Sequence, residues 1–222
     1  MSAALFDRVA LTKILREGVD ALGLALEPGT IAALIDYLAL LSKWNAVYNL
    51  TAVRDPQQMV VQHLLDSLAI LPAFFHVKHV LDVGAGGGLP GMVLAIWARQ
   101  AQPSMRVSMI DTVQKKTAFL TQAKVELGLT NVTIHTKRVE QLEVSVPFEV
   151  ITSRAFAELG DFVQWSGHLL AQQGRFIAMK GVVPCDEISR LPEGWQVSEV
   201  RPLQVPGMDA ERHLIFIERK AA

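Results

Sequence analysis

Apolar positions in the first part of the chain recur every three to four residues, which is the spacing of an amphipathic helix. The pattern predicts helices over about 6–18, 31–48 and 56–71. Thr30 is the expected N-cap of the second helix and Asp55 that of the third, because hydroxyl and carboxylate side chains accept hydrogen bonds from the first free N–H groups.

The pattern changes after residue 72, where short apolar runs alternate with helical stretches. Alternation of this kind is typical of a mostly parallel sheet with helices on both faces. Strands are predicted over 77–83, 106–110, 132–135, 149–152, 176–179, 196–205 and 213–218. Helices are predicted from the glycines near 88 to about 99, and over 113–127, 162–170 and 186–191, with a turn at 172–174.

The predicted fold class is therefore α/β, and the last two strands form an antiparallel hairpin at one sheet edge because their connection is short. We expect two parts: a helical extension over 1–72 that packs on the second part, and an α/β domain over 73–222.

Composition limits the classes of function. Half of the 222 residues are hydrophobic and 19% are charged, so the chain is expected to bury a large core. A net charge of −1 argues against a protein that coats nucleic acid non-specifically. The single Cys185 excludes an internal disulfide and a multi-cysteine metal site, and it suits a reducing cytoplasm. We see no signal peptide and no apolar run long enough to span a membrane.

The densest chemical signal is the segment from Val80 to Gly91, in which a short apolar run reaches Asp82 and five glycines then occupy eight positions. This order predicts a buried strand, a tight turn and a helix start. Glycine allows a ligand to lie directly on the backbone, and the helix start offers free N–H groups and a positive dipole end. We expect a small ligand to bind here.

Other polar residues follow the remaining strands of the predicted sheet. In open α/β sheets ligands bind beyond the carboxyl ends of the strands. The residues placed there are Asp82, Asp111, Val139, Glu140, Ser153, Arg154 and Lys180.

Two cofactor classes fit the glycines. Gly86, Gly88 and Gly91 match the dinucleotide fingerprint, which alone is a weak signal. Counted from Gly84, however, the third glycine position is Leu89, so the pyrophosphate pattern is out of register. The segment from Leu81 to Gly88 instead resembles the S-adenosylmethionine loop of class I methyltransferases. In that family the acidic residue before the first glycine helps hold the methionine end, and a carboxylate after strand two holds the ribose.

The residues after the fourth strand narrow the choice of methyl acceptor. Enzymes that act on exocyclic amines carry an Asn/Asp-Pro-Pro-aromatic motif there, whereas this chain has Ser153-Arg154-Ala155-Phe156. Methylation of cytosine C5 needs a thiolate, and Cys185 follows the fifth strand instead. A ring nitrogen such as guanine N7 has a free lone pair and no proton to lose, so it needs no base.

Two polar clusters precede the sheet. Lys43, Trp44, Asn45, Tyr48, Asn49, Thr51 and Arg54 surround a predicted helix end, and His63, Asp66 and Ser67 neighbour one another on the next helix. The first cluster suits base stacking and phosphate binding, and the second suits a substrate pocket. The alternatives are core-edge aromatics and an ordinary ion pair between His63 and Asp66.

Taken together, the motifs resemble the RsmG family, also called glucose-inhibited division protein B. In chain order they are Lys43-Trp44-Asn45, Tyr48-Asn49-Leu50-Thr51, Arg54-Asp55-Pro56, His63-x-x-Asp66-Ser67, Asp82 to Gly91, Ser153 to Ala157, Met179-Lys180-Gly181 and Glu211-Arg212-His213-Leu214. The resemblance implies methylation of N7 of guanine 527 in the decoding-region loop of bacterial 16S rRNA. It also implies S-adenosylmethionine contacts from Gly84, Leu89, Val139, Glu140 and Arg154.

The expected roles divide into two groups. The cofactor set is Gly84, Gly86, Gly88, Leu89, Asp82, Asp111, Val139, Glu140 and Arg154. The substrate set is Asn49, Arg54, His63, Asp66 and Lys180. We assign no acid, base or metal ligand, and we expect a cytoplasmic monomer that acts on 16S rRNA within the small ribosomal subunit or its assembly intermediate.

Two rival functions fit the same chain. A methyltransferase for a small molecule or a protein would use the loop from Trp44 to Arg54 as a lid. A Rossmann-like binding module would bind the cofactor without catalysis.

Overall fold

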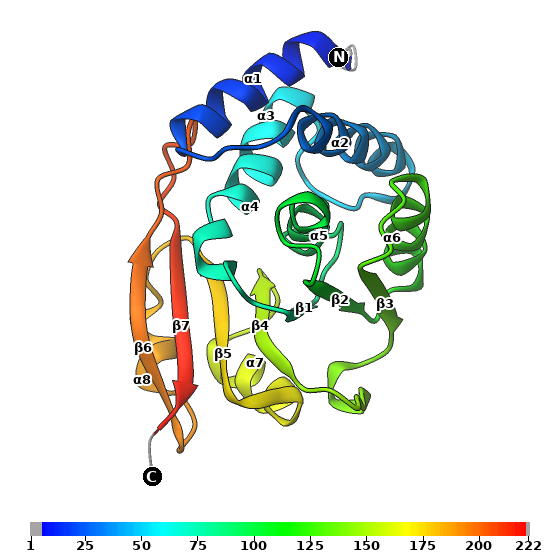
Figure 1. The fold of residues 1–222 in the computed structure, drawn as a ribbon. Coiled ribbons are helices and arrows are strands. Elements are labelled where there is room, and N and C mark those ends of the chain that lie inside the picture. Colours follow the sequence, from blue (N-terminus) through cyan, green and yellow to red (C-terminus); the bar gives the residue numbers. More distant parts are fainter. Residues whose placement is uncertain (1–5, 221–222) are drawn as a thin grey trace.

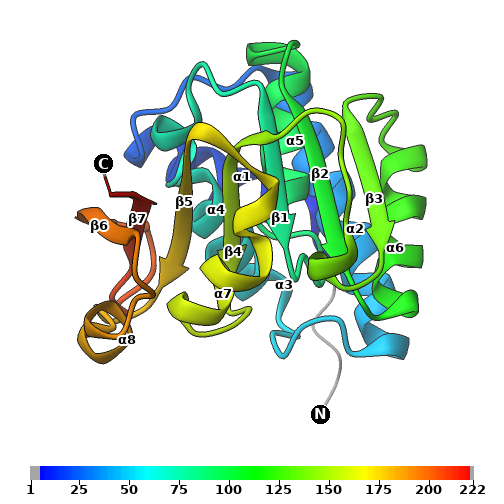
Figure 2. The same cartoon turned by 90° about the horizontal axis from the view of Figure 1, so that it is seen from below.

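The computed structural model describes residues 6–220, which form a seven-stranded sheet in the order β3-β2-β1-β4-β5-β7-β6 (Figures 1 and 2). The strands are β1 (His79–Val83), β2 (Arg106–Asp111), β3 (Val132–Thr136), β4 (Phe148–Arg154), β5 (Leu170–Lys180), β6 (Trp195–Pro202) and β7 (His213–Arg219). Strands β1 to β5 pair in parallel, whereas β7 runs antiparallel to β5 and to β6. The predicted α/β class and its edge hairpin are confirmed.

Helices cover both faces of this sheet, as Figure 2 shows. The N-terminal segments are α1 (Arg8–Ala21), α2 (Pro28–Tyr48), α3 (Pro56–Met59), the π-helix η1 (Val60–Leu65), α4 (Asp66–Leu68) and the 3-10 helix η2 (Leu71–Phe74). They lie on the same face as α5 (Gly91–Ala101) and α6 (Gln114–Glu126). The other segments are η3 (Val139–Gln141), α7 (Leu159–Ser166), η4 (Gly167–Leu169) and α8 (Cys185–Ser189), and α7 packs on the opposite face.

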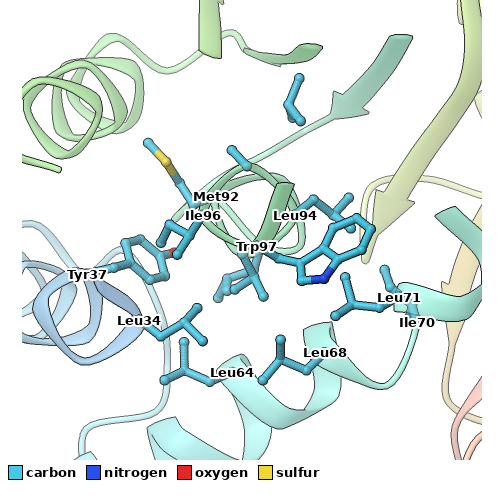
Figure 3. Packing of buried hydrophobic residues seen from close by; sticks show 14 of the residues in the cluster. Leu34, Tyr37, Leu64, Leu68, Ile70, Leu71, Met92, Leu94, Ile96 and Trp97 are labelled. Atoms are coloured by element: carbon cyan, nitrogen blue, oxygen red, sulfur yellow. The ribbon is translucent and has the colours of Figure 1, made fainter. Parts of the chain in front are cut away.

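The hydrophobic core consists of two clusters, one on each face of the sheet, and side chains of β1 contribute to both. Val80 faces the cluster that contains the N-terminal helices, whereas Leu81 and Val83 face the cluster built on α7. Figure 3 shows how α2 and the segment from η1 to η2 close around α5, with Leu34, Leu64 and Leu68 facing Ile96 and Trp97. Because one continuous core spans the chain on both sides of residue 72, the N-terminal helices pack on the sheet domain, while the division into two domains at that residue stays a prediction.

Two helix starts and ends differ from the sequence prediction. Helix α1 continues beyond Gly18 to Ala21, and α2 begins at Pro28 with Glu27 as its N-cap, so the prediction of Thr30 as N-cap was wrong. Proline has a fixed φ that suits the first helical position, and the helix therefore starts three residues earlier than predicted. The Thr30 hydroxyl instead donates a hydrogen bond to Gln100 on α5.

The third predicted helix is not continuous. Asp55 caps α3 as predicted, but the chain then forms the π-helix η1, and Pro72 lies inside η2 rather than ending a helix. The π turn brings His63, Leu64, Leu65 and Asp66 all into buried positions. Spacing of apolar residues does not distinguish a π turn from an α turn over six residues, and short π segments occur frequently at functional sites.

The predicted turn at 172–174 is also wrong. Strand β5 begins at Leu170 and runs through these residues, and its pairing with β4 changes register between Phe148 and Val150. Gln172, Gln173 and Gly174 therefore form an irregular part of the strand. Their residue types are also common in turns, so the sequence alone did not separate the two structures.

Within the described range 6–220, no helix is both long enough and apolar enough to cross a membrane.

Candidate functional site

The glycine loop between β1 and α5 leaves the carboxyl end of the central strand. Gly84 has φ +67°, and a Cβ built there would lie 2.4 Å from Cδ2 of Phe156, so both conformation and space favour glycine. Gly88 has φ +90°, and its Cβ would meet Met92 and Leu120 at 2.7 and 2.8 Å. Gly84 thus opens the loop toward a neighbouring cleft, whereas Gly88 allows the loop to pack on helices.

The N-terminal helices help to hold this loop. The hydroxyl of Tyr37 on α2 donates a hydrogen bond to the carbonyl of Gly87. Tyr37 is fully buried, and burial raises its pKa, so the hydroxyl keeps the proton that it donates. Through this contact, a residue fifty positions earlier in the chain holds the loop in place. The only indication of it in the sequence was a tyrosine within an apolar helix.

Asp82 is fully buried at the end of β1. Its Oδ2 accepts a hydrogen bond of 2.8 Å from the N–H of Gly91 at the start of α5, whereas Oδ1 has no partner among the described residues. Burial raises the pKa of Asp82 to about 7, although the Gly91 hydrogen bond and the charge of Arg154 act in the opposite direction. An unpartnered buried carboxylate oxygen favours binding of a positively charged or N–H-donating ligand group.

We predict a pH effect from Asp82. Between about pH 4 and pH 7 the folded protein keeps a proton on Asp82 that the unfolded chain has released, so this group makes stability fall as pH rises through that window. Asp82→Asn keeps the shape and removes the titration. We expect the loss of unfolding free energy between pH 5 and pH 8 to be smaller in Asp82→Asn by roughly 2–4 kcal/mol.

The measurement is urea unfolding of both ligand-free proteins at these two pH values. Identical pH dependence in the two proteins would show that Asp82 is ionised in the fold at all pH values above about 4.

The glycine-loop cleft has a volume of about 390 Å³. It is lined by Val83, Gly84, Ile110, Asp111, Thr112, Val113, Lys116, Lys137, Arg138, Val139, Glu140, Ala155, Phe156 and Trp165. Asp111 receives hydrogen bonds from the backbone N–H groups of Gly86 at 3.0 Å and Val113 at 2.8 Å, which brings the carboxylate against the loop. The cleft thus combines a carboxylate with bare backbone.

Part of the cleft wall is apolar, although Lys116, Lys137 and Arg138 also line the cleft. Val139 is buried, and the rings of Phe156 and Trp165 stand edge to face with centroids 5.8 Å apart. A flat ring fits such walls, and the carboxylates of Asp111 and Glu140 can accept hydrogen bonds from hydroxyl or amino groups. The predicted residues Gly84, Asp111, Val139 and Glu140 therefore meet in one cleft.

The other predicted cofactor residues lie around it. Asp82 and Gly86 support the loop by the hydrogen bonds described above. Leu89 belongs to the hydrophobic core and is only 5% exposed, and Arg154 faces a second pocket.

The second pocket, which we call the polar pocket, has a volume of about 420 Å³ and shares Ala155 with the glycine-loop cleft. Its lining consists of Gln62, His63, Asp66, Arg154, Ala155, Met179, Lys180, Gly181 and Arg212. Ala155 has φ +55°, a conformation that costs a non-glycine residue energy and that is frequent at functional sites. The two hollows thus meet at a strained residue directly after β4.

Asp66 organises the charges of the polar pocket. Its Oδ2 lies 2.9 Å from Nη1 of Arg154, and its Oδ1 lies 3.0 Å from Nε of Arg212. The carboxylate is only 1% exposed, whereas the two arginines are about one-quarter exposed. One carboxylate between two guanidinium groups leaves one net positive charge beside the pocket, which favours an electron-rich ligand.

His63 lies beside this ion cluster as a neutral base. Its Nε2 is 2.9 Å from the hydroxyl of Thr51, and burial together with Arg154 lowers its pKa to about 4. His63 therefore pairs with Thr51 rather than with Asp66, so the interpretation as an ordinary ion pair is wrong.

Lys180 ends β5 at the edge of the polar pocket. Its Nζ lies 2.8 and 3.1 Å from the carboxylate oxygens of Glu187 and 3.2 Å from the carbonyl of Ala157. Glu187 also accepts a hydrogen bond from the N–H of Leu159 at the start of α7. Glu187 on α8 thus holds the ammonium group of Lys180 in place. The two residues are only seven positions apart, but the sequence did not indicate this contact.

Asn49 and Arg54 lie outside both pockets. Asn49 ends α2 in a left-handed conformation with φ +51°, and its Oδ1 accepts a hydrogen bond of 2.9 Å from Nη2 of Arg54. Trp44 and Tyr48 stack nearby with ring centroids 5.0 Å apart, and Tyr48 is exposed. The structure therefore brings His63, Asp66 and Lys180 together but leaves Asn49 and Arg54 in a separate surface cluster.

Sequence reasoning missed several residues of the two hollows. Tyr37 and Glu187 were not considered, and Arg212 was noted only as part of a motif. These side chains come from α2, from α8 and from the residue before β7. The partners of Tyr37 and Arg212 are far away in sequence, whereas Glu187 is only seven positions from Lys180. Motif grouping gave a signal for Arg212 but none for Glu187.

Comparison with known sequences gives one consistent result. The family described as "GidB: rRNA small subunit methyltransferase G" matches residues 30–215. A protein of Herminiimonas arsenicoxydans named ribosomal RNA small subunit methyltransferase G is 70% identical over 96% of this chain and 98% of its own length. A protein of the same name from Janthinobacterium sp. (strain Marseille) is 66% identical over 96% of this chain and 97% of its own length.

Solved structures agree on the fold. A putative O-methyltransferase from Klebsiella pneumoniae has a TM-score of 0.59 with 14% identity, and the match covers 96% of this chain and 99% of that one. At this identity the similarity concerns the fold alone, which is that of class I methyltransferases.

Proposed function

The chain belongs to the rRNA small subunit methyltransferase G family, and on this premise we propose that it transfers a methyl group from S-adenosylmethionine to N7 of guanine 527 in 16S rRNA. The observation that carries the proposal is the junction at Ala155, where the glycine-loop cleft meets the polar pocket. A cofactor in one hollow and an acceptor base in the other would meet at that residue.

The residues of the glycine-loop cleft fit S-adenosylmethionine. When bound, this cofactor supplies a methyl group on a positively charged sulfur. Asp111 suits its ribose hydroxyls, and the walls at Val139 and Phe156 suit its adenine. Asp82 is buried and does not line the cleft, and its unpartnered Oδ1 is the group that we assign to the ammonium end. We propose Gly84, Gly86, Gly88, Leu89, Asp82, Asp111, Val139, Glu140 and Arg154 as the cofactor set, in which Gly86, Gly88 and Leu89 shape the loop.

Methylation of guanine N7 does not require this chain to act as a general acid or base. The N7 lone pair forms the new bond to carbon as the bond from carbon to sulfur breaks, and no proton leaves the base. Neither His63, neutral near pH 7, nor Asp66, with both oxygens paired, is required as a general base. The protein therefore has to align the base with the methyl carbon, which accounts for much of such catalysis.

The polar pocket supplies that alignment in our proposal. Lys180 and Arg154 provide donors for the guanine O6 or for a phosphate, and His63 offers a neutral ring nitrogen. Asp66 acts through the two arginines that it holds. Asn49 and Arg54 would contact the RNA outside the pocket, beside the exposed Tyr48.

We also propose the context in which the enzyme works. Binding of free RNA relies mainly on positive charge, and the net charge of this protein is −1. A folded RNA target that is recognised by its shape therefore suits the protein better than free RNA. The proposed target is 16S rRNA within the small ribosomal subunit or its assembly intermediate, and the proposed enzyme is a cytoplasmic monomer with a helical extension over residues 1–72.

The test uses labelled S-adenosylmethionine with three acceptor fractions: unmethylated small subunits, deproteinised 16S rRNA and a metabolite extract. Label in 16S rRNA supports the proposal. Label only in metabolites would favour the small-molecule methyltransferase, and cofactor binding without transfer would favour a binding module.

Lys180→Ala tests the substrate side of the site. A charged hydrogen bond contributes about 1.5–3 kcal/mol, so we expect methyl transfer to fall by roughly ten- to a hundredfold while cofactor affinity stays within about twofold. Lys13→Ala is the matched control, because Lys13 is 77% exposed on α1 and lines neither pocket. Unchanged transfer, or a loss of cofactor binding, would remove Lys180 from the acceptor site.

A further inference from the structure

A third hollow adjoins the polar pocket and shares no lining residue with the glycine-loop cleft. It has a volume of about 510 Å³ and lies where α1, α3 and η1 meet the loop between β6 and β7, which are neighbours in Figure 1. We call it the glutamine pocket, and it is lined by Ile14, Gln57, Gln58, Val61, Gln62, Gly207, Met208, Asp209, Ala210 and Arg212. Volumes of this order are usual for ligand sites.

The glutamine pocket continues the other two hollows. Gln62 and Arg212 line both it and the polar pocket, just as Ala155 lines both the polar pocket and the glycine-loop cleft. The three hollows therefore form a row in which neighbours share a wall. An acceptor that is a chain molecule and places one unit in the polar pocket would place the adjacent unit in the glutamine pocket.

Amide groups dominate the polar part of this lining. The backbone N–H groups of Gln57 and Gln58 are bound by Asp55, and the carbonyl of Gln62 is bound by Arg154. No hydrogen bond joins the side-chain amides of these three glutamines to any residue in the described range 6–220. Three free amides, two from adjacent residues of α3 and one from about a turn later in η1, offer donors and acceptors together, which is the pairing that nucleobase edges require.

The rest of the lining suits the flat face of a base. Ile14, Val61 and Met208 are partly buried and form an apolar surface. Asp209 and Arg212 carry opposite charges, so the hollow has no excess positive charge of the kind that a phosphate site needs. The chemistry therefore favours a base over a phosphate group.

We propose that the glutamine pocket is a second nucleotide subsite, which binds the base next to the methylated guanine in the RNA strand. This inference rests on the proposed function, because it takes the polar pocket as the guanine site. The base lies on Val61 and Met208, and the amides of Gln58 and Gln62 contact its edge. With this subsite the enzyme would select one guanine by its neighbour in the strand.

The first test is the double variant Gln58→Ala/Gln62→Ala, assayed with labelled S-adenosylmethionine and unmethylated small subunits. A base contact through paired amides corresponds to about five- to a hundredfold in affinity, so we expect KM for the subunits to rise at least fivefold. We expect kcat and cofactor affinity to stay within about twofold. The matched control is Gln172→Ala/Gln173→Ala, two exposed glutamines on β5 that line none of these three hollows.

A second test separates the subsite from the proposed function. Binding of a labelled six-nucleotide RNA with a central guanine is compared with that of the same RNA lacking one base beside the guanine. We expect the intact protein to prefer the complete RNA at least fivefold, and the double variant Gln58→Ala/Gln62→Ala to show no preference. A preference without methyl transfer in any assay would retain the subsite and overturn the proposed function.

An unchanged KM in the double variant, when the intact protein methylates the subunits, would overturn the subsite and leave the proposed function standing. Equal binding of both RNAs by the intact protein, or binding of neither, would also overturn the subsite.

Discussion

Replacing Gly84 by alanine is expected to weaken S-adenosylmethionine binding at least about tenfold, or about 1.4 kcal/mol. The added methyl group would lie 2.4 Å from Phe156, so either the loop or that ring, both of which line the cleft, must shift. The positive φ of Gly84 adds roughly 1–2 kcal/mol of backbone strain in any L-residue. Calorimetric titration with the cofactor measures the change.

Gly128→Ala is the control for this experiment. Gly128 has nearly the same φ, +62°, but a Cβ added there would have nothing within 4 Å, and the residue follows α6 outside the cleft. Both variants therefore suffer the strain, and only Gly84→Ala suffers the collision. Equal affinities in the two variants would contradict the assignment of Gly84 to the cofactor site.

Replacing Asp66 by alanine is expected to lower the free energy of unfolding by about 3 kcal/mol, because two guanidinium groups then remain side by side without their counter-ion. We take the lower end of the usual range since both arginines are partly exposed. For a chain of this size the loss corresponds to a fall in Tm of roughly 6–12 °C. Thermal unfolding by calorimetry measures it.

Asp36→Ala is the matched control, because Asp36 pairs with Arg8 on the surface and is 47% exposed. Such pairs contribute at most about 1 kcal/mol. If both variants lost the same small amount of stability, Asp66 would not be the carboxylate that holds Arg154 and Arg212 together.

The fold was largely predictable because its signals are local. Alternation of apolar strands with helical stripes predicted the parallel sheet, and the short link before His213 predicted the edge hairpin. The errors occur where one local pattern fits two structures. The six residues of the π-helix η1 carry the same apolar spacing as an α-helix, and Gln172 to Gly174 have turn composition although they lie in β5.

The cleft was predictable for a different reason. The carboxyl ends of parallel strands meet at one edge of the sheet, so Gly84, Asp111 and Glu140 could be brought together because each follows a predicted strand. The polar pocket was only half predictable. His63 and Asp66 were selected as neighbours on one helix and Lys180 as the end of a strand, but their partners Thr51, Arg212 and Glu187 depend on how the N-terminal helices and α8 pack.

Leu89 shows the limit of the resemblance as a source of site residues. The family pattern implied a cofactor contact there, whereas the side chain is 5% exposed and packed in the core cluster. Its backbone N–H is bound by the carbonyl of Ala85, which stabilises the loop. The physical role of Leu89 in the described structure is to shape the loop, and any direct cofactor contact stays a prediction.

The most direct test of the central claim is to map the methylated nucleotide. Unmethylated small subunits are incubated with the protein and S-adenosylmethionine, and the 16S rRNA is then cleaved at N7-methylguanine by borohydride reduction followed by aniline. We expect one new cleavage, at guanine 527. Cleavage at another guanine, or methylation at an atom other than N7, would contradict it.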